Sequence, residues 1–400
     1  MSDVVVIGAG VIGLGIAWRC AQRGAVVTVV DPAPGSGASN TAAGMLAPVT
    51  ELHFGEAPLL DLNLDSAARY PGFVAELTEA TGLEVGYVQC GTVVAAWDAA
   101  DLSSLQDLQR YATSLGRRSE LLTGRELRRE VPALAAGLPG GLLARDDHQV
   151  DNRLLINALL LATERAGARI VHARASAVVT SNGRAIAVRT DDGERLDAGT
   201  VVLAAGAWSR QLDGVPDAAL PPVRPVKGQT VRLRASGPPL LPHIVRGSVK
   251  GSPVYIVPRT NGELVIGASS EDAGFDTRPR AGAVYELLRD AQSLVPLLGE
   301  AELVEVSTSV RPGSPDNAPI VGPSGLDGLI VATGHYRNGI LLTPVTADGI
   351  AALIADGTLP EVLAPFTPDR FSVDRLGTDE LGTDRLGTDR LTNVETSACN

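Results

Sequence analysis

The sequence comprises 400 residues, 44% of them hydrophobic, which is enough for two domains with substantial cores. Its formal net charge of −12 opposes binding to nucleic acid or to an acidic membrane, so we expect a small-molecule partner. The three cysteines, Cys20, Cys90 and Cys399, stand at unrelated spacings, which excludes a disulfide framework and a CxxC metal site.

The apolar stretch at 4–18 fits neither a signal peptide nor a membrane span. It follows Asp3 rather than a basic segment, contains four glycines and ends at Arg19. The histidines share no metal-ligand spacing, so no metal site is expected. We therefore predict a cytoplasmic protein with reduced thiols.

The first thirty residues alternate between strand and helix patterns. The run VVVIG at 4–8 suits a buried strand, residues 10–24 suit a helix closed by Gly24, and AVVTVVD at 25–31 suits a second buried strand. These three segments predict a βαβ unit.

Later segments repeat this pattern and predict that the nucleotide-binding domain is assembled from separated pieces. A helix running into a strand is expected at 152–170, a strand at 201–209 and a strand followed by a helix at 328–357. The predicted bounds are 1–80, 148–220 and 305–368 for this domain, and 81–147 and 221–304 for a second, substrate-binding domain.

The inserted segments suggest a mostly antiparallel sheet. Residues 252–269 read as two strands around Asn261 and Gly262, a pair that favours a type I′ hairpin turn, and residues 227–235 and 301–313 are further strand candidates. The tail at 369–400 contains a five-residue repeat that is too polar to bury a face, so we predict that it is disordered.

The sequence GAGVIG at 8–13 is a GxGxxG motif between a predicted strand and helix. Asp31 ends the next strand at a spacing suited to a ribose hydroxyl. Gly8 permits the turn, Gly10 lets the backbone approach a pyrophosphate, and Gly13 allows close helix packing. The motif predicts a dinucleotide site, and a glycine-rich turn without ligand is the alternative. From the motif alone the dinucleotide is NAD or FAD.

Several motifs in order resemble the D-amino-acid oxidase family of flavoproteins, in the form of the glycine oxidases of thiamin biosynthesis. They are GSGASNTAAGMLAP at 35–48, VVLAAGAWS at 201–209, VYIVPR at 254–259, VRPGSPDNAPIVG at 310–322 and GHYRNGILLTP at 334–344. The resemblance, from residue 3 to about 366, implies non-covalent FAD. It also implies a Rossmann-like α/β domain in separated segments and an α+β substrate domain.

The resemblance also implies which residues hold the cofactor. Ala38 and Ser39 would lie by the pyrophosphate, and Ala43, Gly44 and Met45 near the isoalloxazine ring. The full expected set is Gly8, Gly10, Val11, Ile12, Gly13, Asp31, Pro32, Ala38, Ser39, Ala43, Gly44, Met45, Ser176, Gly206, His335, Tyr336, Arg337, Asn338, Gly339, Ile340 and Leu341.

An arginine suits an amino-acid substrate because its planar fork offers two parallel donors to a carboxylate. By resemblance, Arg311 in SVRPG binds the carboxylate, and the hydroxyl of Tyr255 in VYIVPR reaches the same group. The alternatives are a surface ion pair for Arg311 and a core position for Tyr255. At Ser270 the resembled enzyme carries a methionine, so the smaller serine is expected to enlarge the pocket.

Arg337 belongs, by resemblance, to a segment that runs along the flavin near the substrate pocket. The amides of Gly339 and Ile340, at the start of a predicted helix, are expected to face the pyrimidine side of the ring, where reduction leaves negative charge. A helix-capping or salt-bridge role is the alternative for Arg337. His335 is not assigned as a catalytic base.

The resemblance implies oxidation of glycine, or of sarcosine or small D-amino acids, by hydride transfer to FAD. The products would be imine or glyoxylate, ammonia and hydrogen peroxide, with oxygen as acceptor and hand-over to a thiazole-forming enzyme. A dehydrogenase for D-amino acids or sarcosine with another acceptor, a tRNA-modifying domain and a non-enzymatic flavoprotein are the alternatives. The acidic charge disfavours RNA. Assembly as a homo-oligomer is left open.

Overall fold

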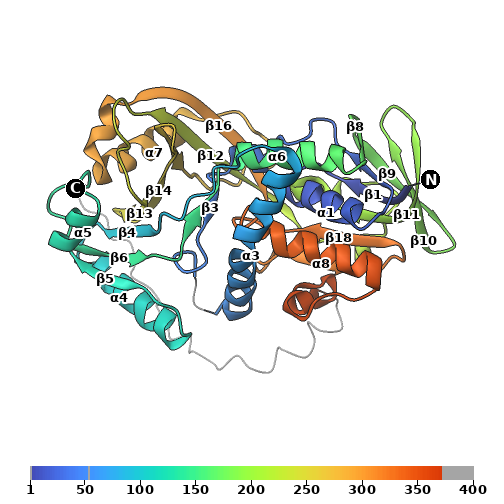
Figure 1. Cartoon of the computed structure of the whole chain (residues 1–400), viewed down its shortest axis with the longest axis horizontal. Coiled ribbons are helices and arrows are strands. Elements are labelled where there is room, and N and C mark those ends of the chain that lie inside the picture. Colours follow the sequence, from blue (N-terminus) through green and yellow to red (C-terminus); the bar gives the residue numbers. More distant parts are fainter. Residues whose placement is uncertain (1, 53–54, 372–400) are drawn as a thin grey trace, which may run out of the picture.

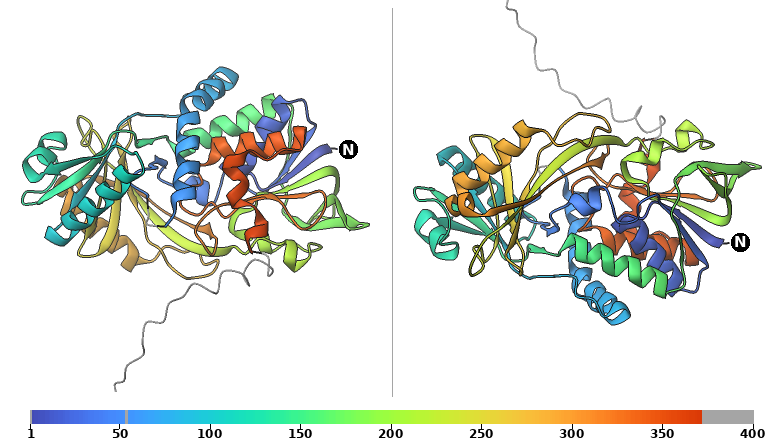
Figure 2. Two further views of the ribbon diagram at one scale, coloured as in Figure 1. Left: turned by 90° about the horizontal axis from the view of Figure 1, so that it is seen from below. Right: turned by 90° about the horizontal axis from the view of Figure 1, so that it is seen from above.

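Short β-branched runs form the centre of one sheet, and longer alternating strands form a second sheet beside it. The computed structural model describes residues 2–52 and 55–371. Along the long axis of the molecule, the largely parallel sheet with its helices lies at the N-terminal end in Figure 1, and the largely antiparallel sheet lies at the opposite end. Helix α3 (Ala57–Thr81) stands between them (Figure 2).

The first sheet is built around β1, which lies between two parallel neighbours. Its strand order is β17, β18, β11, β1, β2 and β8, and only β17 runs antiparallel to its partner along this path. The strands are β1 (Ser2–Ile7), β2 (Val27–Val30), β8 (Arg169–Val171), β11 (Arg195–Leu203), β17 (Ile320–Pro323) and β18 (Leu329–Thr333).

Both faces of this sheet are buried, as the continuous apolar runs predict. Val4 and Val6 face a core formed with the helices, whereas Val5 and Ile7 face the hairpin of β9 and β10. The covering elements are α1 (Val11–Gln22), α3, α6 (Asn152–Arg165), α8 (Thr343–Asp356), β9 (Ala175–Ser181) and β10 (Arg184–Thr190).

The second sheet has the order β16, β12, β15, β14, β13, β4, β6 and β5, and only its β13–β4 pair is parallel. Its strands are β4 (Thr92–Ala96), β5 (Glu120–Thr123), β6 (Gly140–Ala144), β12 (Arg224–Arg234), β13 (Ile244–Val249), β14 (Ser252–Pro258), β15 (Glu263–Gly267) and β16 (Glu302–Gly313). Helix α7 (Ala281–Leu294) packs on one face, while α4 (Ala99–Ser114) and α5 (Gly124–Glu130) lie at the β5 end.

The remaining elements are short. They are α2 (Ala38–Thr41), the β3 (Met45–Leu46) and β7 (His148–Gln149) pair, and the 3-10 turns η1 (Gly206–Arg210), η2 (Asp217–Ala219), η3 (Pro296–Glu300), η4 (Glu361–Phe366) and η5 (Pro368–Phe371).

This architecture confirms the predicted α/β fold class, with a segmented Rossmann-like part and a mostly antiparallel second sheet. The bound predicted between 304 and 305 needs correction, because β16 pairs with β12 along its whole length and residues 305–313 therefore belong to the second sheet. The other domain bounds stay a proposal. The repeat segment and Cys399 lie outside the described residues.

The predicted type I′ turn at Asn261 is wrong. The β14–β15 loop is four residues long, with Arg259 N–H donating to Glu263 O at 2.7 Å, and only Gly262 has a positive φ. The Asn261 side chain instead accepts from Glu263 N–H at 3.0 Å. A second Asn-Gly pair, at 182–183, adopts the positive φ angles of such a turn, because it forms the two-residue connection between β9 and β10.

Within residues 2–52 and 55–371, no single helix combines the length and apolar character needed to cross a membrane. One pair bent by 105°, Thr343–Asp356 with Glu361–Phe371, meets those criteria by length and composition alone.

Candidate active site

A cavity of about 1190 Å³ lies between the two sheets. It extends from the carboxyl ends of β1, β2 and β11, where parallel α/β sheets bind ligands, to one face of the antiparallel sheet. All of the residues expected from the sequence line it except Gly13: Gly8, Gly10, Val11, Ile12, Asp31, Pro32, Ala38, Ser39, Ala43, Gly44, Met45, Ser176, Gly206, Tyr255, Ser270, Arg311, His335, Tyr336, Arg337, Asn338, Gly339, Ile340 and Leu341.

The nucleotide end of the cavity fits a pyrophosphate. A Cβ on Gly13 would lie 1.9 Å from Gly8 O, so glycine is needed for α1 to approach the turn this closely. The N–H groups of Gly10 and Ile12 border the cavity at the N-terminus of α1 and have no hydrogen-bond acceptor among the described residues. Such amides, at the positive end of a helix, suit phosphate oxygens.

The side chains beside this turn are already engaged with the backbone. Ser39 Oγ accepts from Val11 N–H at 3.1 Å, and the Asp31 carboxylate accepts from Ala9 and Ala33 N–H, both at 2.8 Å. These contacts fix Asp31 at the cavity wall. Ser176 also lines this end, and its hydroxyl donates to the carbonyls of the neighbouring strand β10.

The segment from His335 to Leu341 lines the cavity before α8, and the helix begins later than predicted, at Thr343. Gly339 and Ile340 lie in the preceding turns, where Leu342 N–H already bonds to Asn338 O. Among the described residues no acceptor meets the N–H groups of Gly339, Ile340 or Leu341. These donors therefore belong to an irregular turn rather than to the first turn of a helix.

His335 is buried, and its ring nitrogen lies 3.1 Å from the hydroxyl of Thr346. Burial lowers its pKa to about 3, so the ring is neutral at physiological pH and has a structural place in the turn.

Arg337 is exposed at the cavity rim, with its guanidinium 4.9 Å from the ring centroid of Tyr336. It forms no ion pair among the described residues, and α8 begins several residues later. The side chain is therefore a positive group at the rim and does not cap α8.

Arg311 lies at the opposite wall, on β16. Its guanidinium crosses the neighbouring strand β12 directly above Gly228, where a Cβ would come within 2.4 to 2.5 Å of three guanidinium atoms. One nitrogen donates to Ser269 O at 3.1 Å, and Arg311 forms no ion pair among the described residues. The guanidinium therefore faces the cavity with unused N–H donors. Within the part of the chain that the structure describes, Arg311 is not part of a surface ion pair.

Tyr255 approaches the same place from the other side. It stands opposite Gly267 in the β14–β15 pairing, and a Cβ on Gly267 would lie 2.2 Å from the tyrosine hydroxyl. Burial raises the pKa of Tyr255, and nearby Arg311 opposes this shift less strongly, so the hydroxyl stays protonated and can donate. The guanidinium and the phenol converge on the wall formed by β12 and β15.

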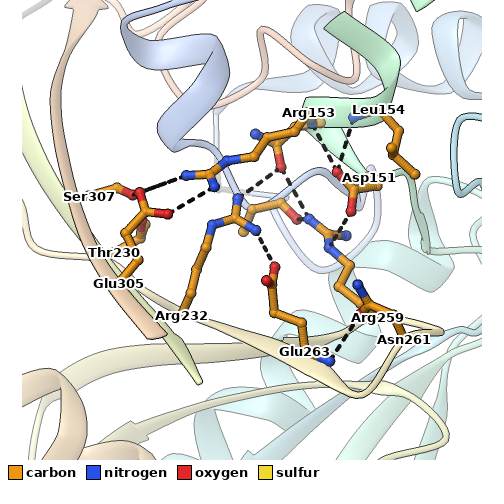
Figure 3. Close-up of polar contacts among 12 residues, drawn as sticks. Asp151, Arg153, Leu154, Thr230, Arg232, Arg259, Asn261, Glu263, Glu305 and Ser307 are labelled. Carbon is orange, nitrogen blue, oxygen red and sulfur yellow. Dashed lines mark hydrogen bonds and ion pairs between the residues drawn. The ribbon is translucent and has the colours of Figure 1, made fainter. Parts of the chain in front are cut away.

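A buried polar network joins the antiparallel sheet to the start of α6 (Figure 3). Arg232 and Arg259 are 1% and 6% exposed. Both donate to Oδ1 of Asn152, at 3.4 and 3.2 Å. Arg232 also pairs with Glu263, and Arg259 lies 3.5 Å from the carboxylate of Asp151. The charges are compensated within the network, as buried ions require.

The same network reaches the loop that borders the cofactor end of the cavity. The amide nitrogen of Asn152 donates to Ser39 O at 2.8 Å and to Asn40 O at 3.0 Å, and Arg259 donates to Ala43 O at 2.8 Å. Burial lowers the pKa of Arg259 to about 10, which leaves it charged at neutral pH. The network therefore ties residues 39–43, which begin in α2, to the sheet that carries Tyr255 and Arg311.

An ion pair lies beyond Tyr255. Arg246 of β13 stands opposite Tyr255 in the strand register and reaches Glu51 at 2.6 Å, and both line the cavity. Arg246 also donates to Thr50 O at 2.9 Å. Thr50 in turn donates its hydroxyl to buried Asp147 at 2.6 Å, and burial raises the pKa of Asp147 to about 6.

Sequence reasoning missed Gly228, Gly267, Asn152, Glu51 and Arg246. The two glycines interrupt runs that otherwise suit strands, a pattern that marks close approach of another group. No comparable signal marks Glu51 and Arg246, because their contact depends on how loop 47–51 meets β13. No three His, Cys, Asp or Glu side chains of the described ranges form a metal-binding group.

Residues 3–353 match the family described as FAD dependent oxidoreductase, DAO. The chain belongs to this family, which confirms the resemblance seen in the motifs and FAD as the cofactor.

Among curated relatives, the chain is 37% identical over 374 residues to the bifunctional protein ThiO/ThiG of Synechocystis sp., with 92% of this chain and 54% of that protein covered. It is 36% identical to the glycine oxidase of Geobacillus kaustophilus over 91% of this chain and 96% of that enzyme. The crystal structure of the latter superimposes with a TM-score of 0.86 and 35% identity, over 92% of this chain and 98% of that one. The chain spans about half the length of the ThiO/ThiG relatives.

Proposed function

We propose that the protein is an FAD-dependent amino-acid oxidase that acts on glycine and on small related amines such as sarcosine and small D-amino acids. The observation that carries this proposal is the convergence of Arg311 and Tyr255 on one wall of a cavity whose other end fits a dinucleotide. Similarity to glycine oxidase over nearly the whole of that enzyme supports the substrate class.

The substrate carboxylate binds between Arg311 and Tyr255. The guanidinium supplies charge and two donors, and the neutral phenol supplies a third donor, so the carboxylate is fixed in orientation as well as in place. Ser270, also at the cavity wall, leaves room beside the α-carbon for a substituent larger than hydrogen.

FAD held in this cavity would supply the two-electron chemistry of amine oxidation, as hydride acceptor and as the group that reduces oxygen. Glycine would lose a hydride and an N–H proton to become an imine, which water converts to glyoxylate and ammonia. The amides of Gly339, Ile340 and Leu341 are placed to stabilise negative charge at the cofactor, and exposed Arg337 adds a further positive group.

The ThiO/ThiG relatives support a further part of the proposal. In them, a region similar to this chain shares one polypeptide with a second part that this chain does not match. We propose that the imine or glyoxylate formed here is handed to a separate thiazole-forming enzyme.

The direct test is oxygen uptake and peroxide formation by the purified, FAD-loaded protein with glycine, sarcosine and D-alanine. We expect turnover with each of the three and loss of turnover in Arg311→Met at unchanged FAD content. Reduction of an artificial dye without oxygen uptake would instead indicate a dehydrogenase, and no reaction with any amine would refute the proposal.

A further inference from the structure

The Arg246–Glu51 pair lies outside the carboxylate site, further along the same sheet face. The residues Val94, Arg246, Tyr255, Gly267 and Thr230 form one cross-strand row from β4 to β12, and all of them line the cavity. Tyr255 leans from β14 over β15, away from Arg246 on β13. Strands are spaced about 4.8 Å apart, so the backbone of Arg246 lies one strand from that of Tyr255 and two strands from β15, over which the phenol lies.

Glycine is too short to span this distance from the carboxylate site. Its amino nitrogen is only two bonds from the carboxyl carbon, so the bound substrate leaves the region around Glu51 unfilled. The cavity continues past the ion pair to helix α4, and the residues that line it there are Val94, Ala95, Asp101, Ser104, Leu105 and Leu108.

The ion pair offers a carboxylate acceptor to this region. Arg246 already has three acceptors, namely Glu51 at 2.6 Å, Thr50 O at 2.9 Å and the Thr50 hydroxyl at 3.2 Å. Glu51 uses one carboxylate oxygen for Arg246, and its second oxygen has no donor among the described residues. Its side chain is only 12% exposed, so a donor that reached it would form a shielded, charge-assisted hydrogen bond.

We propose that this end of the cavity is a second substrate subsite, in which Glu51 accepts a hydrogen bond from a cationic or donor group carried by the substrate beyond its amino nitrogen. Arg246 orients the Glu51 carboxylate, and Leu105 and Leu108 line the cavity beyond the ion pair. The inference rests on the proposed amine-oxidase function and adds a preferred substrate class, the glycine derivatives with a basic N-substituent. An anionic substituent would lie beside the Glu51 carboxylate, so charge repulsion disfavours it.

Three substrates test the subsite: N-propylglycine and N-aminoethylglycine, whose substituents are equally long, and N-carboxyethylglycine, whose substituent is one atom longer. The measurement is kcat/KM for anaerobic flavin reduction at neutral pH, with the FAD-loaded full-length protein. For the wild type we expect the aminoethyl compound to exceed the propyl compound by at least about tenfold, the value of one charge-assisted hydrogen bond. The carboxyethyl compound should rank last.

The variant Glu51→Gln keeps the shape of the side chain and removes its charge. We expect it to reduce the ratio of aminoethyl to propyl kcat/KM to near one, a readout that cancels any general loss of activity. The control is Glu84→Gln, which removes an exposed carboxylate that does not line the cavity and should preserve the ratio.

The outcomes separate this inference from the function on which it rests. If glycine and sarcosine reduce the flavin but the three compounds react equally, or if the carboxyethyl compound reacts fastest, the subsite is refuted and the oxidase proposal survives. If neither glycine nor sarcosine reduces the flavin, the proposed function itself fails. If Glu51→Gln keeps the wild-type ratio of aminoethyl to propyl kcat/KM, the assignment of Glu51 is refuted.

Discussion

Replacement of Gly228 by alanine is expected to displace the Arg311 guanidinium while leaving the strand intact. The new methyl carbon would lie 2.4 to 2.5 Å from Nη1, Cζ and Nη2 of Arg311. Ordinary contact requires about 3.5 Å, so the guanidinium must move by about 1 Å. It can do so because it is the end of a flexible side chain, and Gly228 has no positive φ that would strain an alanine.

This substitution is expected to disturb the orientation of the substrate and to leave the stability of the fold unchanged. A displacement of about 1 Å in a substrate-positioning group lowers rates by about 10²-fold, or about 2.7 kcal/mol of transition-state stabilisation. We therefore expect kcat/KM for glycine to fall by about 10²-fold in Gly228→Ala, most of it through a weaker carboxylate clamp.

The assay is anaerobic stopped-flow reduction of the flavin over a range of glycine concentrations, with FAD content and thermal unfolding measured in parallel. Gly282→Ala is the matched control, because a Cβ there meets no atom within 4 Å. Unchanged glycine affinity in Gly228→Ala would refute the assigned position of the guanidinium, and so would loss of activity explained entirely by lost FAD.

Three further predictions concern other parts of the site. Tyr255→Phe removes one donor to the carboxylate, so KM for glycine should rise about tenfold at constant FAD content in steady-state kinetics. Arg259→Met leaves buried Ala43 O without its donor and removes the ion-pair partner of the Asp151 carboxylate. It should lower the free energy of unfolding by at least about 3 kcal/mol and weaken FAD binding, whereas Arg153→Met, which breaks a more exposed pair, should cost about 1 kcal/mol or less in the same denaturant and FAD titrations. Asp147 holds its proton more tightly when folded, since its pKa rises from 3.8 to about 6. Its contribution to stability is therefore greatest below the unfolded pKa of 3.8 and falls by about 3 kcal/mol in total as the pH rises through 6. Asp147→Asn should abolish this loss in denaturation measured across that range.

The helices and strands of the nucleotide half were predictable because a short stretch of sequence determines each of them. Buried β-branched runs, the glycine turn at 8–13 and the helix beginning at Asn152 are set by residues close in sequence. The Asn-Gly pairs at 182–183 and 261–262 show the limit of this reasoning. Both favour positive φ, yet only the pair at 182–183 lies in a two-residue connection, and loop length decides the turn.

The roles of individual site residues depended on register between strands far apart in sequence. Gly228 matters because Arg311 crosses it from β16, and Gly267 because Tyr255 crosses it from β14. The Arg311 and Tyr255 positions were reached by resemblance, whereas their glycine partners follow only from the pairing. The start of α8 was misplaced because residues 339–342 form turns that an apolar pattern does not distinguish from a helix.

The central proposal is that an amino-acid carboxylate held by Arg311 presents its α-carbon to FAD. Its most direct test is anaerobic titration of the purified, FAD-loaded protein with glycine, followed by visible spectroscopy. We predict that glycine bleaches the oxidised flavin band fully in the wild type and fails to do so in Arg311→Met, which retains FAD. A wild-type flavin that stays oxidised with excess glycine, sarcosine and D-alanine, or an Arg311→Met variant that bleaches as readily as the wild type, would contradict it.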